Sequence, residues 1–213
     1  MTAKTSDSPA GDRQTDTPES HRHVCPWWLG YLLASPIRRL VESPERLLRP
    51  FIEPGMTIVE PGCGMGYFSV PMARLVGPGG RVVCVDLQQE MLDGLVLRAR
   101  RAGVADRITT RLCAPGDLGL DDLRGAADLV TAIHMIHEVP DRRGLLRQMI
   151  EVLRPGGVCV VAEPAGHVSA EDFAATLALA AQAGLRNTGT PLPGRRRGAV
   201  LVKGGEPEAP TRG

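Results

Sequence analysis

Long apolar runs and an excess of charge are both missing from this chain of 213 residues. No apolar run approaches the ~18 residues of a membrane-spanning helix, so we expect no membrane-embedded segment. Lysine and arginine together number 25 and aspartate and glutamate 24, which leaves a formal net charge of +1. The chain therefore lacks the excess of basic residues that is typical of proteins that bind nucleic acid or anionic membranes. We therefore expect neither partner, and we leave open whether the chain forms a homodimer.

A disulfide framework and a secretion signal are not indicated either. The cysteines are odd in number and scattered, at positions 25, 63, 84, 113 and 159. Residues 1–23 are polar and rich in Pro, Ser and Thr, without the apolar segment of a signal peptide. A reducing, cytoplasmic setting fits these features. A metalloid substrate such as arsenite would need several converging thiolates, and no tight cluster of cysteines favours one.

Composition divides the chain into one domain between two tails. Residues 1–23 and 204–213 have the polar composition of disordered segments. The length fits a single domain, which we place at residues 24–203. Its first part, residues 24–54, predicts a short cap with helices near 27–33 and 45–52. Its remainder, residues 55–203, is the expected core.

Short β-branched runs alternate with helical periodicity through this core, which predicts an α/β fold with a doubly wound parallel sheet. Pro71 is awkward inside a helix, so the regular part of the first core helix is expected to begin near Ser69. The last two strands are joined by a loop without a helix and should pair antiparallel. The seven expected strands are 57–60, 81–86, 107–112, 127–133, 158–163, 185–190 and 199–203. The expected helices are 67–76, 88–102, 142–153 and 170–183.

The stretch from residue 58 to residue 68 carries a ligand-binding pattern. A buried strand runs into three glycines at alternate positions, Gly62, Gly64 and Gly66, and then into a helix. Glycine lets the backbone turn tightly and approach a ligand where a Cβ would clash. Asp86 ends the next strand, and the ends of adjacent parallel strands meet at the ligand crevice. Its carboxylate can accept hydrogen bonds from both hydroxyls of a ribose, so the pattern predicts a nucleoside site.

The spacing of the glycines distinguishes between nucleosides. A dinucleotide fingerprint places its third glycine where this chain has Tyr67, which disfavours a nicotinamide oxidoreductase. Glu60, at the end of the first strand, would repel a pyrophosphate. It suits a ligand that carries an ammonium group.

These features resemble the class I S-adenosylmethionine (SAM)-dependent methyltransferase family over roughly residues 55–203. The resemblance implies a Rossmann-like fold with SAM as cofactor and S-adenosylhomocysteine as product. It also implies methyl transfer to a small-molecule acceptor by in-line displacement. The matching segments are E-x-G-x-G-x-G at residues 60–66, Asp86, ADLV at residues 127–130, HEVPD at residues 137–141 and LRPGG at residues 153–157.

The resemblance assigns residues to each part of the cofactor. Glu60 would hold the methionine ammonium, directly or through water, and Asp86 the ribose. The family usually has an acid for the adenine amino group where this chain has Ala114, so either Asp117 or the backbone of Ala114 would serve instead. The residues that complete the expected cofactor site are Gly62, Cys63, Gly64 and Gly66 at the methionine moiety, and Leu87 and Met91 near the adenine.

Candidate acceptor residues follow the fourth and fifth strands. His137 and His167 are the candidate catalytic bases, because imidazole titrates near neutral pH. His134 and Glu163 are candidate substrate contacts at the same crevice. His134 and His137, three residues apart, could also form a metal site with Glu138 or His167 as a third ligand, but we expect no metal. The family shows no fixed catalytic residue, because a base is needed only when the acceptor carries a proton.

Two further segments have alternative interpretations. Trp27 and Trp28 are the two tryptophans of the chain, and they form either a lid over the substrate or an apolar plug over the sheet end. Arg195, Arg196 and Arg197 either meet an anionic substrate or lie in a solvated loop, and we favour the loop.

The type of acceptor atom, O, N, C or S, stays open at this point. A small molecule is expected, because the cap is short and no nucleic-acid-binding module is appended. The Asn/Asp-Pro-Pro-Tyr signature of enzymes that methylate base amines is absent after the fourth strand. The alternatives to a methyltransferase are a cyclase or lyase that consumes SAM, and a protein that binds SAM without catalysis.

Overall fold

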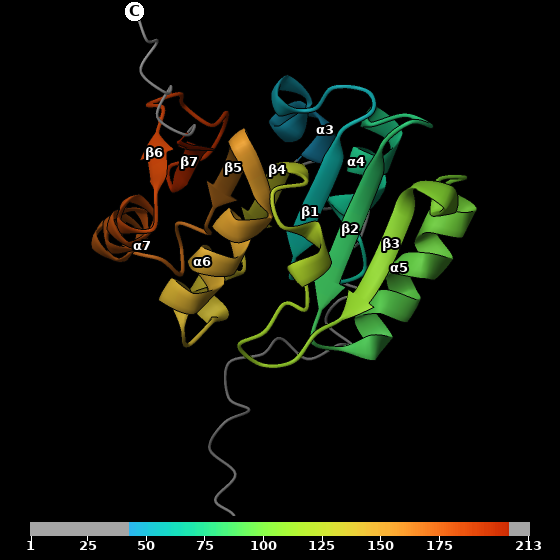
Figure 1. Cartoon of the computed structure of the whole chain (residues 1–213), viewed down its shortest axis with the longest axis horizontal. Coiled ribbons are helices and arrows are strands. Elements are labelled where there is room, and N and C mark those ends of the chain that lie inside the picture. Colours follow the sequence, from blue (N-terminus) through green and yellow to red (C-terminus); the bar gives the residue numbers. More distant parts are fainter. Residues whose placement is uncertain (1–42, 205–213) are drawn as a thin grey trace, which may run out of the picture.

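A computed structural model describes residues 43–204, and within them seven strands form one sheet in the order β3-β2-β1-β4-β5-β7-β6. Figure 1 shows the strands side by side in this order. The five strands from β1 to β5 pair in parallel, while β7 lies antiparallel between β5 and β6. The expected fold, including the antiparallel last strand, is therefore confirmed. The strands are β1 (Thr57–Pro61), β2 (Arg81–Asp86), β3 (Ile108–Leu112), β4 (Ala127–Ile133), β5 (Leu153–Ala162), β6 (Leu185–Asn187) and β7 (Gly198–Lys203).

The strand order reverses beside β1. The chain runs from β1 outward to β2 and β3, and then crosses back so that β4 lies on the other side of β1. At such a switch point the loops that follow the two central strands diverge, and ligands of open α/β sheets bind in the crevice outside their carboxyl ends. The residues that follow β1, β2, β4 and β5 therefore face a common edge.

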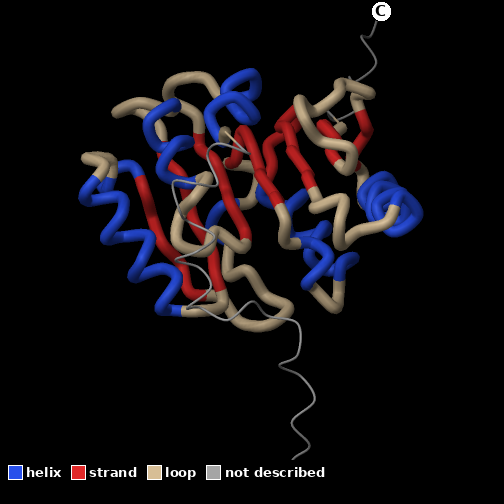
Figure 2. The backbone as a smooth tube through the Cα atoms, turned by 180° about the vertical axis from the view of Figure 1, so that it is seen from behind, coloured by secondary structure: helices blue, strands red, loops and turns tan. Residues whose placement is uncertain are grey.

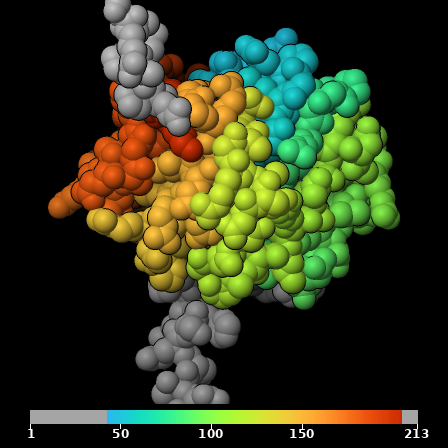
Figure 3. Space-filling model, in the orientation of Figure 1, coloured from blue at the N-terminus to red at the C-terminus, as the bar shows by residue number. Residues whose placement is uncertain are grey.

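Helices cover both faces of the sheet, as Figure 2 shows. Ile58 and Leu129 pack on the face covered by α3, α4 and α5, while Val59 and Val130 pack on the face covered by α6 and α7. On the second face the segment after β3 also contributes apolar side chains, and Figure 3 shows these yellow-green residues beside the yellow helix α6. The helices are α3 (Pro44–Leu48), α4 (Ser69–Leu75), α5 (Gln89–Arg101), α6 (Arg142–Val152) and α7 (Ala170–Gln182).

Element boundaries follow the sequence closely, with two differences. Helix α4 begins at Ser69, as Pro71 indicated. Strand β5 begins at Leu153, five residues earlier than expected, because Leu153 pairs with Ala127 across a shift in register. Strand β6 ends three residues early at Asn187, whose side-chain oxygen accepts the Gly189 N–H at 2.9 Å and turns the chain away.

The cap is described in part. The helix expected over residues 45–52 is confirmed as α3 followed by a 3-10 turn, Arg49–Phe51. The helix expected over residues 27–33 and both tails lie outside the described residues, so the division of the chain into tails and one domain stays a prediction. Among residues 43–204 no helix is both long enough and apolar enough to cross a membrane.

Lys203 in β7 connects the antiparallel edge of the sheet to helix α6. Its ammonium group donates to the carbonyl oxygens of Ile150 and Leu153 at 2.7 and 2.6 Å. Carbonyls at a helix end lack partners within the helix, and a cation there also interacts favourably with the helix dipole.

We therefore predict that Lys203→Met lowers the free energy of unfolding by about 1.5–3 kcal/mol, the usual worth of hydrogen bonds to a charged group. Urea titration followed by circular dichroism measures this change. The control is Arg186→Met, which removes an exposed cation from the neighbouring strand β6 and should change stability by less than about 0.5 kcal/mol. Equal losses in the two variants would contradict the assignment.

Candidate active site

The loop after β1 is held in a shape that requires glycine. Gly62, Gly64 and Gly66 have φ angles of +65°, +51° and +77°, in the left-handed region. A Cβ on Gly66 would collide with the buried side chain of Leu95, and a Cβ on Gly62 would lie 3.1 Å from the Cβ of Met135. Nothing lies within 4 Å of the position of a Cβ on Gly64. The loop is thus packed at both ends and open at its centre, where a ligand can approach the backbone.

Asp86 fixes the centre of this loop. Its Oδ2 accepts the N–H of Gly64 at 2.8 Å and its Oδ1 accepts the N–H of Gln88 at 3.0 Å. Each carboxylate oxygen has a second lone pair, so both can accept one more hydrogen bond. The residue is 9% exposed, and this burial raises the pKa of its carboxyl group, while backbone N–H donors from Gln88, Gly64 and Leu87 oppose the rise. The geometry suits a pair of ribose hydroxyls.

Glu60 lies beneath the loop, 5% exposed. Its Oε2 accepts the hydroxyl proton of Ser69 at 2.5 Å, and the thiol of Cys84 lies 4.0 Å from the same oxygen. Burial raises the pKa of Glu60 to about 8, the Ser69 hydrogen bond opposes this, and the charge of Asp86 adds to it. A cation at this carboxyl group would favour its ionised form, which fits an ammonium ligand and not a pyrophosphate.

Ser69 was not among the residues that the sequence singled out for the site. The sequence feature that could have identified Ser69 is a residue with a hydroxyl group at the start of the helix that follows the glycine loop. Cys63, which was singled out, packs its thiol into the core on the α4 face. Its N–H donates to the carbonyl of Val85 and its carbonyl accepts the N–H of Gly66, both at 3.1 Å. Cys63 therefore serves the loop through its backbone.

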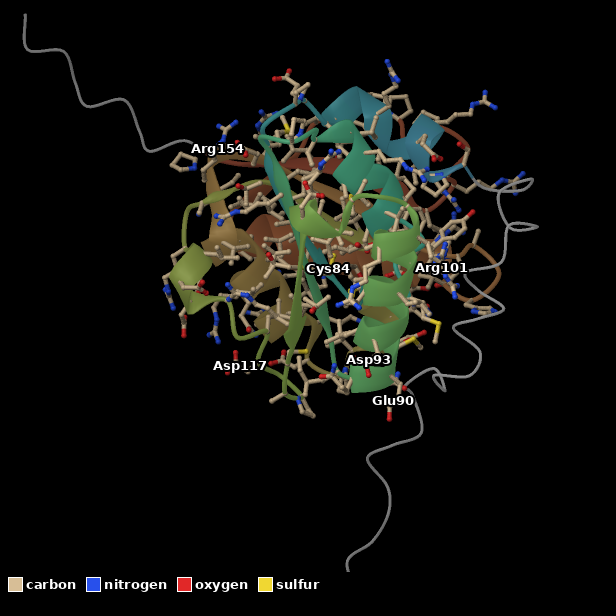
Figure 4. The ribbon with its side chains drawn as sticks, turned by 90° about the vertical axis from the view of Figure 1, so that its right-hand side faces the viewer. Cys84, Glu90, Asp93, Arg101, Asp117 and Arg154 are labelled. Atoms are coloured by element: carbon tan, nitrogen blue, oxygen red, sulfur yellow. The ribbon has the colours of Figure 1, made fainter. Side chains whose placement is uncertain are left out.

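The expected adenine residues lie near the carboxyl ends of β2 and β3. Met91 is buried, whereas Leu87 is 41% exposed. The N–H of Cys113 donates to the carbonyl of Asp86 at 3.0 Å, and Ala114 and Asp117 exchange two backbone hydrogen bonds in a tight turn. Figure 4 shows Asp117 at the same end of the molecule as the start of α5.

Asp117 itself is exposed, and its carboxylate accepts the N–H of Gly119 at 2.9 Å. Gln148 of α6 holds the turn in place, because its amide donates to the Gly116 carbonyl at 2.8 Å and accepts the Leu118 N–H at 2.7 Å. The turn is therefore positioned by α6, on the face of the sheet that α6 and α7 cover. The roles of Ala114 and Asp117 toward an adenine remain predictions.

On the other side of the glycine loop lies the segment after β4. Its first residue, His134, has a φ of +60°, which is uncommon for a residue other than glycine. The N–H of His134 donates to the carbonyl of Ala162 at 2.7 Å, its ring lies edge-on to Phe68 at 6.4 Å, and its Nε2 lies 3.3 Å from Nη1 of Arg195. Arg195, expected in a solvated loop, is thus half-buried against the site.

His137 is bound by both oxygens of one buried carboxylate. Its Nδ1 lies 2.6 Å from Oε2 of Glu163, and its backbone N–H donates to Oε1 at 3.2 Å. The His167 ring is 6.3 Å from the His137 ring, and Glu138 Oε1 is 3.9 Å from His137 Nε2. Three of the predicted acceptor residues, His137, His167 and Glu163, therefore gather in one place.

A metal site at this cluster is not supported. Within residues 43–204 no group of three or more His, Cys, Asp or Glu side chains is arranged to hold a metal ion. Trp27 and Trp28, expected to form either a lid or an apolar plug, lie outside the described residues.

A sequence profile described as a methyltransferase domain matches residues 52–190. The chain belongs to the methyltransferase-domain family. The match begins just before β1 and extends past β6, so it includes the glycine loop, Asp86 and the segment after β4.

Similar proteins agree with this assignment. A ubiquinone biosynthesis O-methyltransferase of Xanthomonas campestris is 33% identical over 104 residues, which are 49% of this chain and 41% of the relative. A nocamycin O-methyltransferase of Saccharothrix syringae is 32% identical over 104 residues, which are 49% of this chain and 36% of that protein. The match thus spans less than half the length of these relatives. The structure of a SAM-dependent methyltransferase from Aquifex aeolicus superposes with a TM-score of 0.73 at 18% identity, over 84% of this chain and 99% of that one, and shares its fold.

The buried carboxyl of Glu60 predicts a pH-dependent stability. In the folded protein this group keeps its proton up to about pH 8, whereas in the unfolded chain it ionises near its ordinary value of 4.5. Between these values the folded state binds one more proton, so stability falls as pH rises, by up to about 1.4 kcal/mol per pH unit. We expect Glu60→Gln to flatten this part of the profile, measured as the free energy of unfolding between pH 5 and pH 8. Equal slopes in the two proteins would contradict the burial of an acid here.

Proposed function

We propose that this protein is a SAM-dependent methyltransferase that transfers a methyl group to a small molecule. The observation that carries the proposal is the glycine loop, open at Gly64 and fixed there by Asp86. A nucleoside can lie against the exposed backbone with its ribose on the carboxylate. Glu60, buried below the same loop, supplies the negative charge for an amino-acid ammonium. Membership of the methyltransferase-domain family supports the same ligand.

The residues present suit SAM better than a dinucleotide. A pyrophosphate would need the third glycine that Tyr67 replaces, and its negative charge would oppose the ionisation of both buried acids, Glu60 and Asp86. When bound, SAM supplies an electrophilic methyl group on a sulfonium. Asp86 would bind and orient the ribose, and the backbone from Gly62 to Gly66 would line the methionine moiety. The crevice after β4 and β5 would then hold the acceptor in line with the methyl group, since positioning supplies much of the rate of such a displacement.

A small-molecule acceptor is supported by the names of the two curated relatives, which are O-methyltransferases for ubiquinone biosynthesis and for nocamycin. We further propose that the protein acts in the cytoplasm. The cysteines at 63, 84, 113 and 159 are all unpaired, which suits a reducing compartment.

Calorimetric titration with SAM, S-adenosylhomocysteine and NAD tests the cofactor. We predict micromolar binding of both sulfur nucleosides and none of NAD. Asp86→Ala should weaken binding at least tenfold, because it removes the ribose acceptor and frees the Gly64 loop. The matched control is Asp106→Ala, an exposed acid before β3 at the opposite edge of the sheet, which should leave the affinity within twofold.

Two results would separate the alternatives. If no sulfur nucleoside binds, the proposed cofactor is wrong. If SAM binds and incubation yields methylthioadenosine in place of S-adenosylhomocysteine, the protein consumes SAM by a cyclase or lyase reaction.

A further inference from the structure

Glu163 and His137 are joined by two hydrogen-bonding contacts, one to the ring and one to the backbone, which fix their relative orientation. Both carboxylate oxygens bind one residue, Oε2 at the ring and Oε1 at the backbone N–H. The main chain of Glu163 is fixed as well, since its N–H donates to the carbonyl of Arg197 at 2.8 Å. Three segments, those after β4 and β5 and that before β7, therefore set the position and the orientation of one imidazole.

This contact determines which ring nitrogen carries the proton. An ionised carboxylate only accepts hydrogen bonds, so with Glu163 in that form the nitrogen 2.6 Å from its Oε2 would carry the proton, as Nδ1–H. In the neutral imidazole the other nitrogen, Nε2, then carries the lone pair. Glu163 thus holds His137 in the tautomer that can accept a proton at Nε2.

Because Nδ1 faces Glu163, Nε2 lies on the part of the ring that this carboxylate does not contact. The His137 side chain is 19% exposed and that of Glu163 is 2% exposed, so solvent and ligands reach the imidazole but not the carboxylate. Nε2 lies 3.9 Å from Oε1 of Glu138. Burial raises the pKa of Glu138, and the charge of Asp86 contributes in the same direction. The segment that carries His137 also packs against the glycine loop, since a Cβ on Gly62 would lie 3.1 Å from the Cβ of Met135.

We propose that His137, positioned by Glu163, is a general base and that the methyl acceptor is a phenolic hydroxyl. This inference rests on the proposed methyltransferase function and narrows it. A base is superfluous for a thioether or for a neutral amine with a free lone pair. A phenol, with a pKa near 10, is protonated at neutral pH and within reach of an imidazole, whereas an aliphatic alcohol is a far weaker acid.

The step is balanced without any further reactant. A lone pair of the phenolic oxygen forms the new C–O bond, the C–S bond of the sulfonium breaks with its electron pair going to sulfur, and the hydroxyl proton passes to Nε2 of His137. Glu163 stabilises the resulting imidazolium through Nδ1–H. The proton then leaves to solvent, which reaches the imidazole.

The decisive variant is His137→Asn. The asparagine amide can still donate to Glu163 in the place of Nδ1–H, but it has no group in the place of Nε2. We expect kcat for catechol to fall about 10²–10⁴-fold, the usual contribution of a general base, with SAM affinity within twofold of wild type. The deficit should shrink at least tenfold with 4-nitrocatechol, whose more acidic hydroxyl ionises without help. A purely structural role for His137 would lower both rates by the same factor.

A second readout needs no turnover. In ¹⁵N NMR spectra of the protein labelled at histidine, the resonances missing from His137→Asn identify the ring, and the wild type should show a neutral Nδ1–H tautomer. In Glu163→Gln the side-chain amide can donate as well as accept, so this tautomer should no longer be enforced. The Nε2–H tautomer in the wild type would overturn the proposal.

The panel of acceptors separates this inference from the proposed function. Without SAM binding, the proposed function itself fails. If SAM binds and the methyl group reaches aniline or thiophenol but no phenol, only the acceptor class and the base are wrong. The loss of kcat is also compared between catechol and 4-nitrocatechol in His167→Asn. If that loss depends on acceptor acidity in His167→Asn and not in His137→Asn, the base is His167 and the proposed role of His137 is wrong.

Discussion

The hydrogen bond from the Gly64 N–H to the Asp86 carboxylate is the interaction on which the site depends. It joins the loop after β1 to the end of β2. The bonded residue, Gly64, is the middle one of three glycines with left-handed φ angles, Gly62, Gly64 and Gly66. Because a Cβ on Gly66 would collide with Leu95 and a Cβ on Gly62 would crowd Met135, these two positions of the loop are suited to glycine. The same carboxylate keeps lone pairs for a ribose. In the proposed function, one contact would thereby shape the backbone that receives the nucleoside and supply the carboxylate that binds its ribose.

The buried charges are divided between the two halves of the crevice. On the cofactor side, Glu60 and Asp86 are two carboxyls whose pKa values burial raises, an arrangement that a bound ammonium would relieve. On the acceptor side, Glu163 has the imidazole of His137 as its partner. The sheet brings these halves together, because β1 and β4 are neighbours at the switch point while their following loops diverge.

The sequence predicts element boundaries and motifs that depend on a local pattern of residues. It does not predict features that depend on contacts between segments distant in the chain. The bounds of β4 and the start of α4 follow from an apolar run and from Pro71. The glycine spacing also predicted a loop that the structure joins to Asp86. The early start of β5 was not predicted, because Pro155, Gly156 and Gly157 are unfavourable in strands. The strand nevertheless begins at Leu153, which pairs with Ala127 across a register shift. His137 and Glu163 were each candidates, but 26 residues separate them and only the adjacency of β4 and β5 joins them. Ser69 was missed because its role exists only beside a buried Glu60.

Incubation with SAM that carries a deuterated methyl group tests the central claim most directly. The protein is given catechol as acceptor, and both products are analysed by mass spectrometry. We expect the labelled methyl group to be transferred intact to one oxygen of catechol, with one equivalent of S-adenosylhomocysteine formed for each methylated product. S-adenosylhomocysteine without a methylated acceptor, or intact SAM after prolonged incubation with every phenol, amine and thiol tried, would show that the protein is not such a methyltransferase.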